Sequence, residues 1–389
     1  MAVSFPCRGA VGKAFRACRI AFTAVLLTIS GVFSLSAQSG DFLYATNGGT
    51  VVLTKYAGPG GVVTTPDFIE GLPVTRIGEW AFEGCTNLTS VITLNNIRDI
   101  RLGAFRSCVN LERVALGAGI TNIEHGALHE CPSLAEVMVS PDNYSFSSRD
   151  GILFDKNQTK LLLYPAARGG SYTIPEGVET IDFWAFEFCT RLTSVTLPNT
   201  VRRIGGCAFF GCTALESVNI PAGVNEIEEQ AFAYCSSLTA VTLPASVGLL
   251  TAHAFLNCTN LAAVYFYGNA PLEALSFLGR SPFEGDAWAT NYFLPGTVGW
   301  ELSFNGRPVV PWHLGNPRIL LLPVSGQTNS FSFVLSWATN ASVVVEACTN
   351  LANPAWTPVA TNTLVDGSAA FVDPDFAVCW ARFYRLRAL

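Results

Sequence analysis

The stretch Ala208-Phe209-Phe210-Gly211-Cys212-Thr213-Ala214-Leu215 contains the pattern Ala-Phe-x-x-Cys-x-x-Leu, which decides the fold because it recurs along the chain. Neighbouring copies are 23 residues apart, except for one step of 58 residues between the third copy and the fourth. The seven copies begin at Ala81, Ala104, Ala127, Ala185, Ala208, Ala231 and Ala254, and the third has Leu128 in the place of the phenylalanine. A fixed period of this length predicts a solenoid, in which each unit buries its apolar residues against its neighbours.

Each unit combines two apolar patterns of different spacing. In the fifth unit, Ile204, Phe209 and Cys212 recur at helical spacing, whereas Val218 and Ile220 alternate with polar neighbours as in a strand. The sequence therefore predicts 23-residue units made of a short helical turn and a β-strand. Proline closes many of these strands, because its missing N–H suits a chain that leaves a ladder.

The first 37 residues have the pattern of a secretory signal peptide. Four cations without an acidic residue precede an apolar stretch that ends in small residues, which favours cleavage after Ala37. A membrane anchor is the alternative, but the apolar run is shorter than the roughly 20 residues of a membrane span. We therefore expect a secreted or cell-surface protein whose mature chain has no transmembrane span.

Composition excludes several classes of protein. The 389-residue chain is 50% hydrophobic and 13% charged, which indicates a large buried core and excludes a disordered chain. Its net charge is −6, and removal of the first 37 residues would make it −10. An acidic chain of this kind is not expected to bind nucleic acid.

The chain has 12 cysteines, seven of which occupy the same place in successive units. That place lies on the apolar face, so we expect a stack of buried, reduced thiols rather than disulfides or a metal ladder. Cys207 lies outside the pattern and is expected to be a partly exposed thiol. Cys348 and Cys379 lie near the C-terminus, and the sequence does not decide whether they form a disulfide.

The pattern divides the chain into five segments: residues 1–37 are the signal peptide, 38–76 an N-terminal β cap, 77–267 the repeats, 268–314 a C-terminal cap and 315–389 a small β-sandwich-like module. The sandwich is expected because apolar and polar residues alternate there in short runs. Ser281-Pro-Phe283 in the cap is a degenerate echo of the Ala-Phe pair. The insertion at about 140–170 reads as a hairpin packed within the stack or, alternatively, as an outward binding loop.

The repeat resembles a known family. The pattern Ile-Gly-x-x-Ala-Phe-x-x-Cys-x-x-Leu-x-x-Val-x-Leu-Pro, as in residues 77–88 and 204–221, is similar to BspA-like bacterial leucine-rich repeats over roughly residues 62–267. The tail, with Arg382-Phe-Tyr-Arg-Leu386, resembles a module of exported proteins of verrucomicrobial-type bacteria. These resemblances imply a surface or secreted interaction protein, and they bring no catalytic residues.

A search for chemistry returns little. The sequence contains no nucleophile elbow, P-loop, zinc-protease helix motif or dinucleotide fingerprint. His125 and His129 lie near Cys131, so the three residues resemble a set of metal ligands, but Cys131 belongs to the apolar stack. We therefore expect no enzyme, no metal site and no cofactor.

The outward strand positions form the candidate site. They make a mostly neutral, hydroxyl-rich row with Tyr265 and Tyr267 as aromatic platforms at one end, and the possible ligand-facing residues are Arg113, Glu136, Thr196, Asn219, Thr242 and Tyr265. Such a row could bind an unknown protein or a polysaccharide through hydrogen bonds, or it could be a solvated face without a ligand. The first hypothesis is a non-enzymatic, exported protein that binds a protein or glycan at the cell surface. The alternative is a structural cell-envelope protein.

Overall fold

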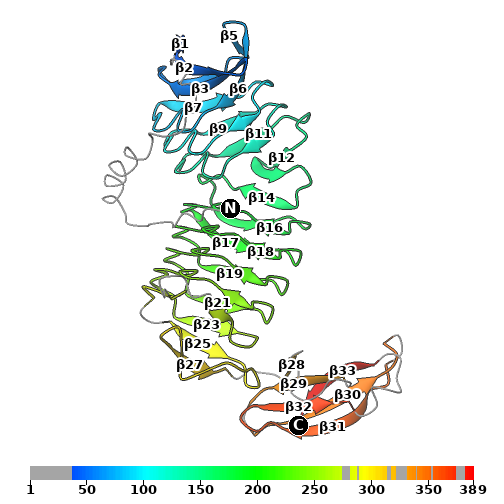
Figure 1. Cartoon of the computed structure of the whole chain (residues 1–389). Helices are drawn as coiled ribbons and strands as arrows, with labels where there is room; N and C mark the ends of the chain where they lie inside the picture. Colours follow the sequence, from blue (N-terminus) through cyan, green and yellow to red (C-terminus); the bar gives the residue numbers. More distant parts are fainter. Residues whose placement is uncertain are drawn as a thin grey trace. The chain divides into compact units, whose positions relative to one another are not determined.

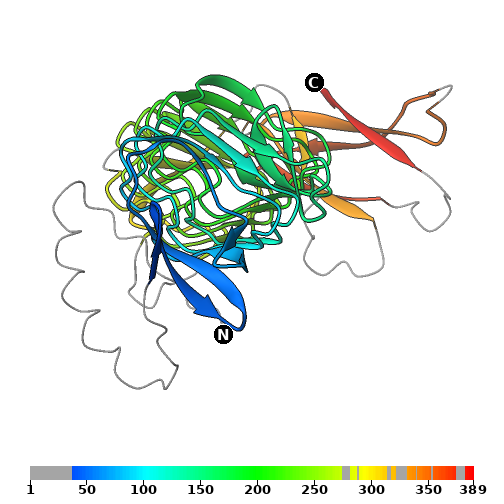
Figure 2. The same cartoon turned by 90° about the horizontal axis from the view of Figure 1, so that it is seen from above.

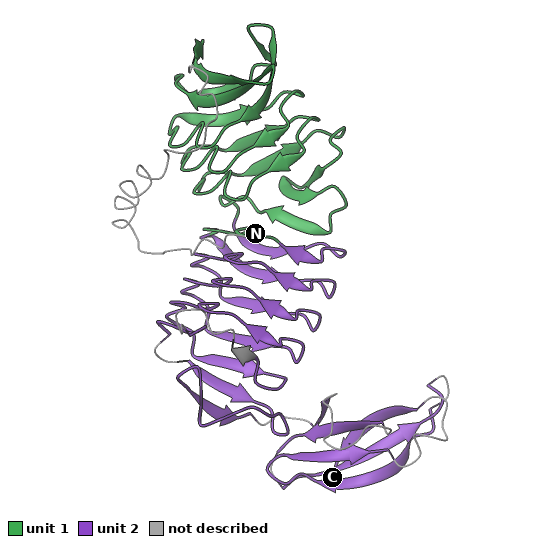
Figure 3. Cartoon of the chain, in the orientation of Figure 1, with its two compact units in different colours: residues 1–168, 182–189 green, residues 169–181, 190–389 purple. Residues whose placement is uncertain are grey.

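The computed structural model describes residues 37–273, 281–286, 289–312, 317–320, 331–338, 340–351, 354–373 and 382–389. All of the regular structure in these ranges is β-strand (Figure 1). Two compact units are present, one of residues 1–168 and 182–189 and the other of residues 169–181 and 190–389 (Figure 3). The predicted signal peptide lies outside the described residues, apart from Ala37.

The first unit begins with a group of turn-separated strands and continues as a stack. The initial strands are β1 (Ala37–Ser39), β2 (Phe42–Asn47), β3 (Thr50–Tyr56), β4 (Gly61–Thr64), β5 (Phe68–Ile69) and β6 (Leu72–Ile77). Successive turns then contribute the longer strands β7 (Leu88–Ile92), β9 (Arg113–Leu116) and β11 (Glu136–Val139), and the two-residue strands β8 (Asp99–Ile100) and β10 (Asn122–Ile123). Each set pairs in parallel, so every turn carries a long strand and a short one.

The second unit repeats this plan over more turns. Its long strands form one parallel sheet in the order β15 (Gly170–Thr173), β17 (Leu192–Thr196), β19 (Ser217–Asn219), β21 (Ala240–Leu243), β23 (Ala263–Phe266), β25 (Thr290–Phe293) and β27 (Arg307–Pro311). The two-residue strand β26 (Ser303–Phe304) pairs antiparallel with β27 at the end of this sheet. Its short strands are β16 (Thr180–Ile181), β18 (Arg203–Ile204), β20 (Glu226–Ile227), β22 (Leu249–Leu250) and β24 (Leu272–Glu273). Within each unit, the turns overlay one another when seen from above (Figure 2).

The predicted short helical turn is wrong, because the described residues contain no helix. Ile204, assigned above to a helical face, lies in strand β18. The segment that follows is a series of tight turns, in which Cys207 has a positive φ of 54°. The N–H groups of Cys207, Phe209 and Gly211 donate to carbonyls of the next turn at 2.7–2.9 Å. Amides that point along the stack at alternate positions are not available for the i to i−4 bonds of a helix.

Aromatic rings fill the interior at the position of the repeat phenylalanine. In the second unit, Phe209, Phe232, Phe255 and Phe283 stack with ring centroids 5.0, 5.3 and 5.7 Å apart. Phe283 confirms the degenerate echo predicted in the C-terminal cap. In the first unit, the stack of Phe82 and Phe105 begins at Tyr56, whose ring lies 5.0 Å from that of Phe82.

Among the described residues the repeat cysteines form no disulfide, and several of their thiols serve as hydrogen-bond donors. The thiols of Cys108, Cys131, Cys235 and Cys258 each donate to the phenylalanine carbonyl of the preceding turn, at 3.0–3.2 Å. The prediction of buried, reduced thiols is confirmed for these residues and for Cys189 and Cys212, whereas Cys85 is only half-buried. The expectation for Cys207 is wrong, because its side chain is buried beside Gln230.

The insertion packs inside the first unit. It contains β12 (Phe146–Arg149), which the sequence did not suggest, and the hairpin of β13 (Ile152–Asp155) and β14 (Lys160–Leu163). Ile152, Phe154 and Leu161 are buried, so the alternative of an outward binding loop is wrong for these strands. Tyr164 then takes the place of a repeat phenylalanine and stacks on Phe186 at 4.9 Å.

The C-terminal module consists of two three-stranded antiparallel sheets. One contains β28 (Arg318–Leu320), β29 (Ser332–Ser336) and β32 (Ser368–Val372), and the other contains β30 (Ser342–Cys348), β31 (Thr357–Thr363) and β33 (Phe383–Ala388). The sheets share a core of Phe333, Leu335, Val343, Val345, Leu364 and Phe371, which confirms the predicted sandwich-like module. Cys348 is buried and unpaired, and Cys379 lies outside the described residues. The predicted boundary at residue 315 also lies outside the described residues and stays a prediction.

Candidate functional site

The outward positions of the second unit's long strands form a regular row. Cross-strand pairing places Thr196 beside Asn219, Asn219 beside Thr242, and Thr242 beside Tyr265. Inward residues between them, such as Val195 and Val241, are buried, so the alternation of a strand holds the row on the solvent side. The structure thus brings together four of the six residues predicted as ligand-facing.

The remaining two predicted residues lie in the first unit. Arg113 on β9 and Glu136 on β11 are paired across adjacent strands, and their side chains form an ion pair at 2.7 Å. The Arg113 side chain is 62% exposed, so this pair is worth at most about 1 kcal/mol. Its two charges largely satisfy each other, which leaves little net charge on this face for a ligand.

Two aromatic residues that the sequence did not place join Tyr265. Tyr292 on β25 pairs with Tyr265, and the two rings stack at 5.0 Å. The ring of Trp312 lies 4.7 Å from that of Tyr265 and 5.2 Å from that of Tyr267. All four side chains are half-buried. The 23-residue period stops before Tyr292, so counting could not place it, although the sequence Phe293-Leu294-Pro295 hints at one more strand that is closed by proline.

We call the outward row Thr173, Thr196, Asn219, Thr242, Tyr265 and Tyr292 the outer row. Every member is uncharged, and so are the outward residues of a second row beside it: Ser171, Ser194, Ser217, Ala240, Ala263 and Thr290. The hydroxyls of Ser171 and Ser194 are 2.8 Å apart and hydrogen-bonded. A hydroxyl can both donate and accept a hydrogen bond, so these rows suit a polar, neutral ligand.

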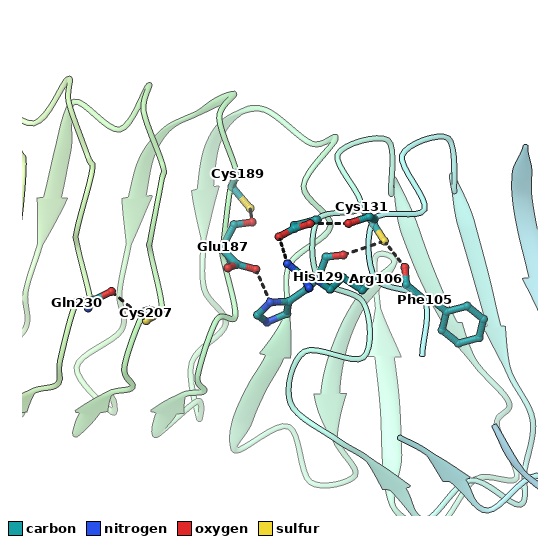
Figure 4. A network of polar contacts seen from close by, with 10 residues as sticks. Phe105, Arg106, His129, Cys131, Glu187, Cys189, Cys207 and Gln230 are labelled. Carbon is teal, nitrogen blue, oxygen red and sulfur yellow. Dashed lines mark hydrogen bonds and ion pairs between the residues drawn. The ribbon is translucent and has the colours of Figure 1, made fainter. Parts of the chain in front are cut away.

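In the first unit, His129 and Cys131, two of the residues considered above as metal ligands, make contacts within the fold (Figure 4). His129 Nδ1 lies 3.1 Å from a Glu187 carboxylate oxygen, and the Trp184 ring packs edge-on at 4.5 Å. Burial lowers the pKa of His129 to about 4, which outweighs the opposite effect of Glu130. The thiol of Cys131 is directed at backbone carbonyls of Phe105 and His129. Among the described residues, no group of histidine, cysteine and acidic side chains could hold a metal ion.

Asp286 in the C-terminal cap is buried, and within the described part of the chain neither carboxylate oxygen has a hydrogen-bond partner. Burial raises the pKa of Asp286 to about 7, although the backbone of Cys258 and the charge of Arg307 act in the opposite direction. Among the described residues, no hydrogen-bonded side chain accompanies this carboxylate as a second reactive group. We therefore treat Asp286 as a determinant of stability rather than of chemistry.

The fold and its exposed sheet define a class of proteins, the parallel β-solenoids with leucine-rich repeats. The BspA type Leucine rich repeat region matches residues 68–151 and 168–281 in six copies, which is more than half of the chain. The chain belongs to this family, as the resemblance of its repeats implied. The match ends at residue 281, so the predicted origin of the C-terminal module stays a prediction. A search of curated proteins finds no match.

Several solved structures are similar to the chain. A leucine-rich cell surface protein of Faecalibacterium prausnitzii is 21% identical over 66% of this chain and 94% of that chain, with a TM-score of 0.40. The leucine-rich repeat protein of T. pallidum is 28% identical over 63% and 88%, with a TM-score of 0.34. The pneumococcal vaccine antigen PcpA is 17% identical over 72% and 100%, with a TM-score of 0.43. Across the described ranges, no helix has the length and apolarity that a membrane crossing requires.

Proposed function

We propose that this protein is an exported, non-enzymatic leucine-rich repeat protein that binds a protein or glycan ligand at the cell surface. The ligand-binding surface is the solvent side of the sheet β15 to β25, with the outer row at its centre. The observation that carries the proposal is the composition of this face: hydroxyl and amide side chains lead to a group of half-buried aromatic rings.

The stack suits binding because it holds these side chains rigidly. From Thr196 to Tyr265, each outer-row residue lies on a strand that is hydrogen-bonded on both sides, with its inward neighbours buried. Side chains fixed on a rigid scaffold lose less conformational entropy when a ligand binds. Charged side chains are the usual occupants of solvent-exposed sites. A solvated face of random composition would therefore be expected to have some charged residues among twelve outward positions, and the two rows have none.

The test is a binding screen with the full chain on a glycan array and on an array of purified surface proteins. We expect at least one ligand whose binding is weakened about tenfold or more, that is by about 1.4 kcal/mol, in the double variant Thr196→Arg, Asn219→Arg. Asn199→Arg adds one positive charge at an exposed position of the turn that follows β17 and should leave binding unchanged. The absence of any ligand on both arrays, or equal binding by the double variant, would count against the proposal.

A structural role in the cell envelope is the second candidate, and the observation that favours it is the C-terminal module, which has its own two-sheet core. In this module Trp356 is half-buried, and the Arg385 guanidinium lies over its ring at 4.6 Å. If a ligand binds the double variant normally but no longer binds Trp356→Ala, the module carries the interaction instead.

A further inference from the structure

The outward side chains of the outer row become abruptly longer between Thr242 and Tyr265. These residues are paired on adjacent strands and project from the same side of the sheet, about 4.7–4.9 Å apart. A tyrosine ring reaches much farther from the backbone than a threonine side chain. Tyr265 therefore stands as a wall beside a low shelf made of Thr242, Asn219 and Thr196.

Two aromatic side chains pack against the Tyr265 ring. Tyr292 stacks on Tyr265 at 5.0 Å with 22° between the ring planes, and Trp312 supports it at 4.7 Å with 51°. On the other adjacent strand the paired residue is Thr242, and among the described residues the rings in contact with Tyr265 are those of Tyr292 and Trp312. The result is a fixed aromatic face that adjoins a shelf of hydrogen-bonding groups.

The chemistry of the shelf selects the class of ligand. A pyranose ring has an apolar face of C–H bonds and a rim of hydroxyl groups, so it can pack one side on an aromatic ring while its rim exchanges hydrogen bonds with hydroxyls and amides. The shelf offers such groups at each strand spacing. It carries no charge, so an anionic or cationic ligand would leave water without a partner of opposite sign.

A protein ligand fits this end of the face less well. The centres of protein interfaces are apolar and close-packed, with aromatic or arginine anchors in pockets. The shelf has small polar side chains, with a single aromatic wall at its end, and the second row beside it consists of serines, alanines and a threonine. It lacks an apolar centre that could exclude water over a protein-sized area.

We propose that the Tyr265 step is a binding site for an uncharged polysaccharide, with one sugar ring against Tyr265 and the following rings along Thr242, Asn219 and Thr196. This inference rests on the proposed function and narrows its ligand to one class. Tyr292 and Trp312 are positioning residues, because they pack against Tyr265, whereas the strand neighbour of Tyr265 on the shelf is Thr242.

The experiment is isothermal titration of the full chain with uncharged hexasaccharides of glucose, mannose and xylose, and with an anionic hexasaccharide of galacturonic acid. We expect binding of at least one uncharged probe and no binding of the anionic one. Tyr265→Ala should raise the Kd at least about tenfold, whereas Tyr265→Phe keeps the ring and should stay within about threefold. Tyr144→Ala removes a tyrosine that is 89% exposed on the first unit and is the matched control, with no expected change.

Circular dichroism and the melting temperature of each variant show that the stack is intact. The site is refuted if no uncharged probe binds, or if a bound probe has the same Kd in folded Tyr265→Ala. In either case, a protein-array ligand that still depends on Thr196 and Asn219 would leave the broader proposed function standing. Failure of both experiments would refute the two together.

Discussion

The rings of Phe209 and Phe232 lie 5.0 Å apart with only 2° between their planes. The two residues are one repeat apart, and the Phe209 N–H donates to the carbonyl of Ala231 at 2.7 Å. The ring spacing is close to the separation of neighbouring strands, so the backbone ladder and the aromatic stack reinforce the same turn-to-turn distance. Both side chains are fully buried.

The first prediction concerns this stack. Phe209→Ala should lower the free energy of unfolding by about 3–5 kcal/mol, because it removes a ring that is enclosed by two neighbouring turns. Urea unfolding followed by circular dichroism measures the change. Thr196→Ala, on the exposed outer row, is the control and should change stability by less than about 0.5 kcal/mol. A loss below about 1 kcal/mol for Phe209→Ala would contradict the central place given to the stack.

The second prediction concerns thiol reactivity in the first unit. Burial raises the pKa of the Cys108 thiol to about 12. Burial also raises the pKa of the Cys85 thiol, which is only half-buried. Alkylation requires a thiolate that the reagent can reach, so Cys85 should react first and Cys108 only after denaturation. Timed treatment with iodoacetamide followed by peptide mass spectrometry gives the order. Equal rates for the two residues, or a disulfide-linked pair of repeat cysteines, would be evidence against the buried thiol stack.

The third prediction concerns the pH dependence of stability through Asp286. Its pKa is raised from the ordinary 3.8 to about 7, so the folded protein keeps a proton that the unfolded chain loses. The favourable contribution is complete below pH 3.8 and is lost as the pH rises toward 7. The second unit should therefore become less stable across this window, by up to a few kcal/mol at about 1.4 kcal/mol per pH unit.

Asp286→Asn provides the test, because the amide has nearly the same shape and does not ionise. Thermal unfolding at pH 5 and pH 8 should show a smaller loss of stability for the variant than for the unmodified chain. Asp142→Asn, at an exposed position, should keep the original pH dependence. If Asp286→Asn and the unmodified chain lose the same stability between these pH values, Asp286 does not ionise in this window.

Part of the candidate site could be derived from the sequence, because a strand exposes alternate residues and the repeat fixes the register. Thr196, Asn219, Thr242 and Tyr265 lie in a row as the 23-residue step predicts. Tyr292 and Trp312 could not be found in this way, since they follow turns of other lengths. Their contacts with Tyr265 depend on pairing between strands that are distant in the sequence.

The sequence by itself determined the solenoid, its period, the buried phenylalanine and cysteine positions and the C-terminal β module, because these follow from repetition and from the burial of apolar residues. Only the tertiary structure decided that the Ala-Phe-x-x-Cys segment forms successive tight turns rather than a helix. One helical turn and one tight turn place apolar residues at similar spacing, so the local pattern cannot separate them. The choice is made by hydrogen bonds to the next repeat, such as Phe209 to Ala231, which form only when the units stack.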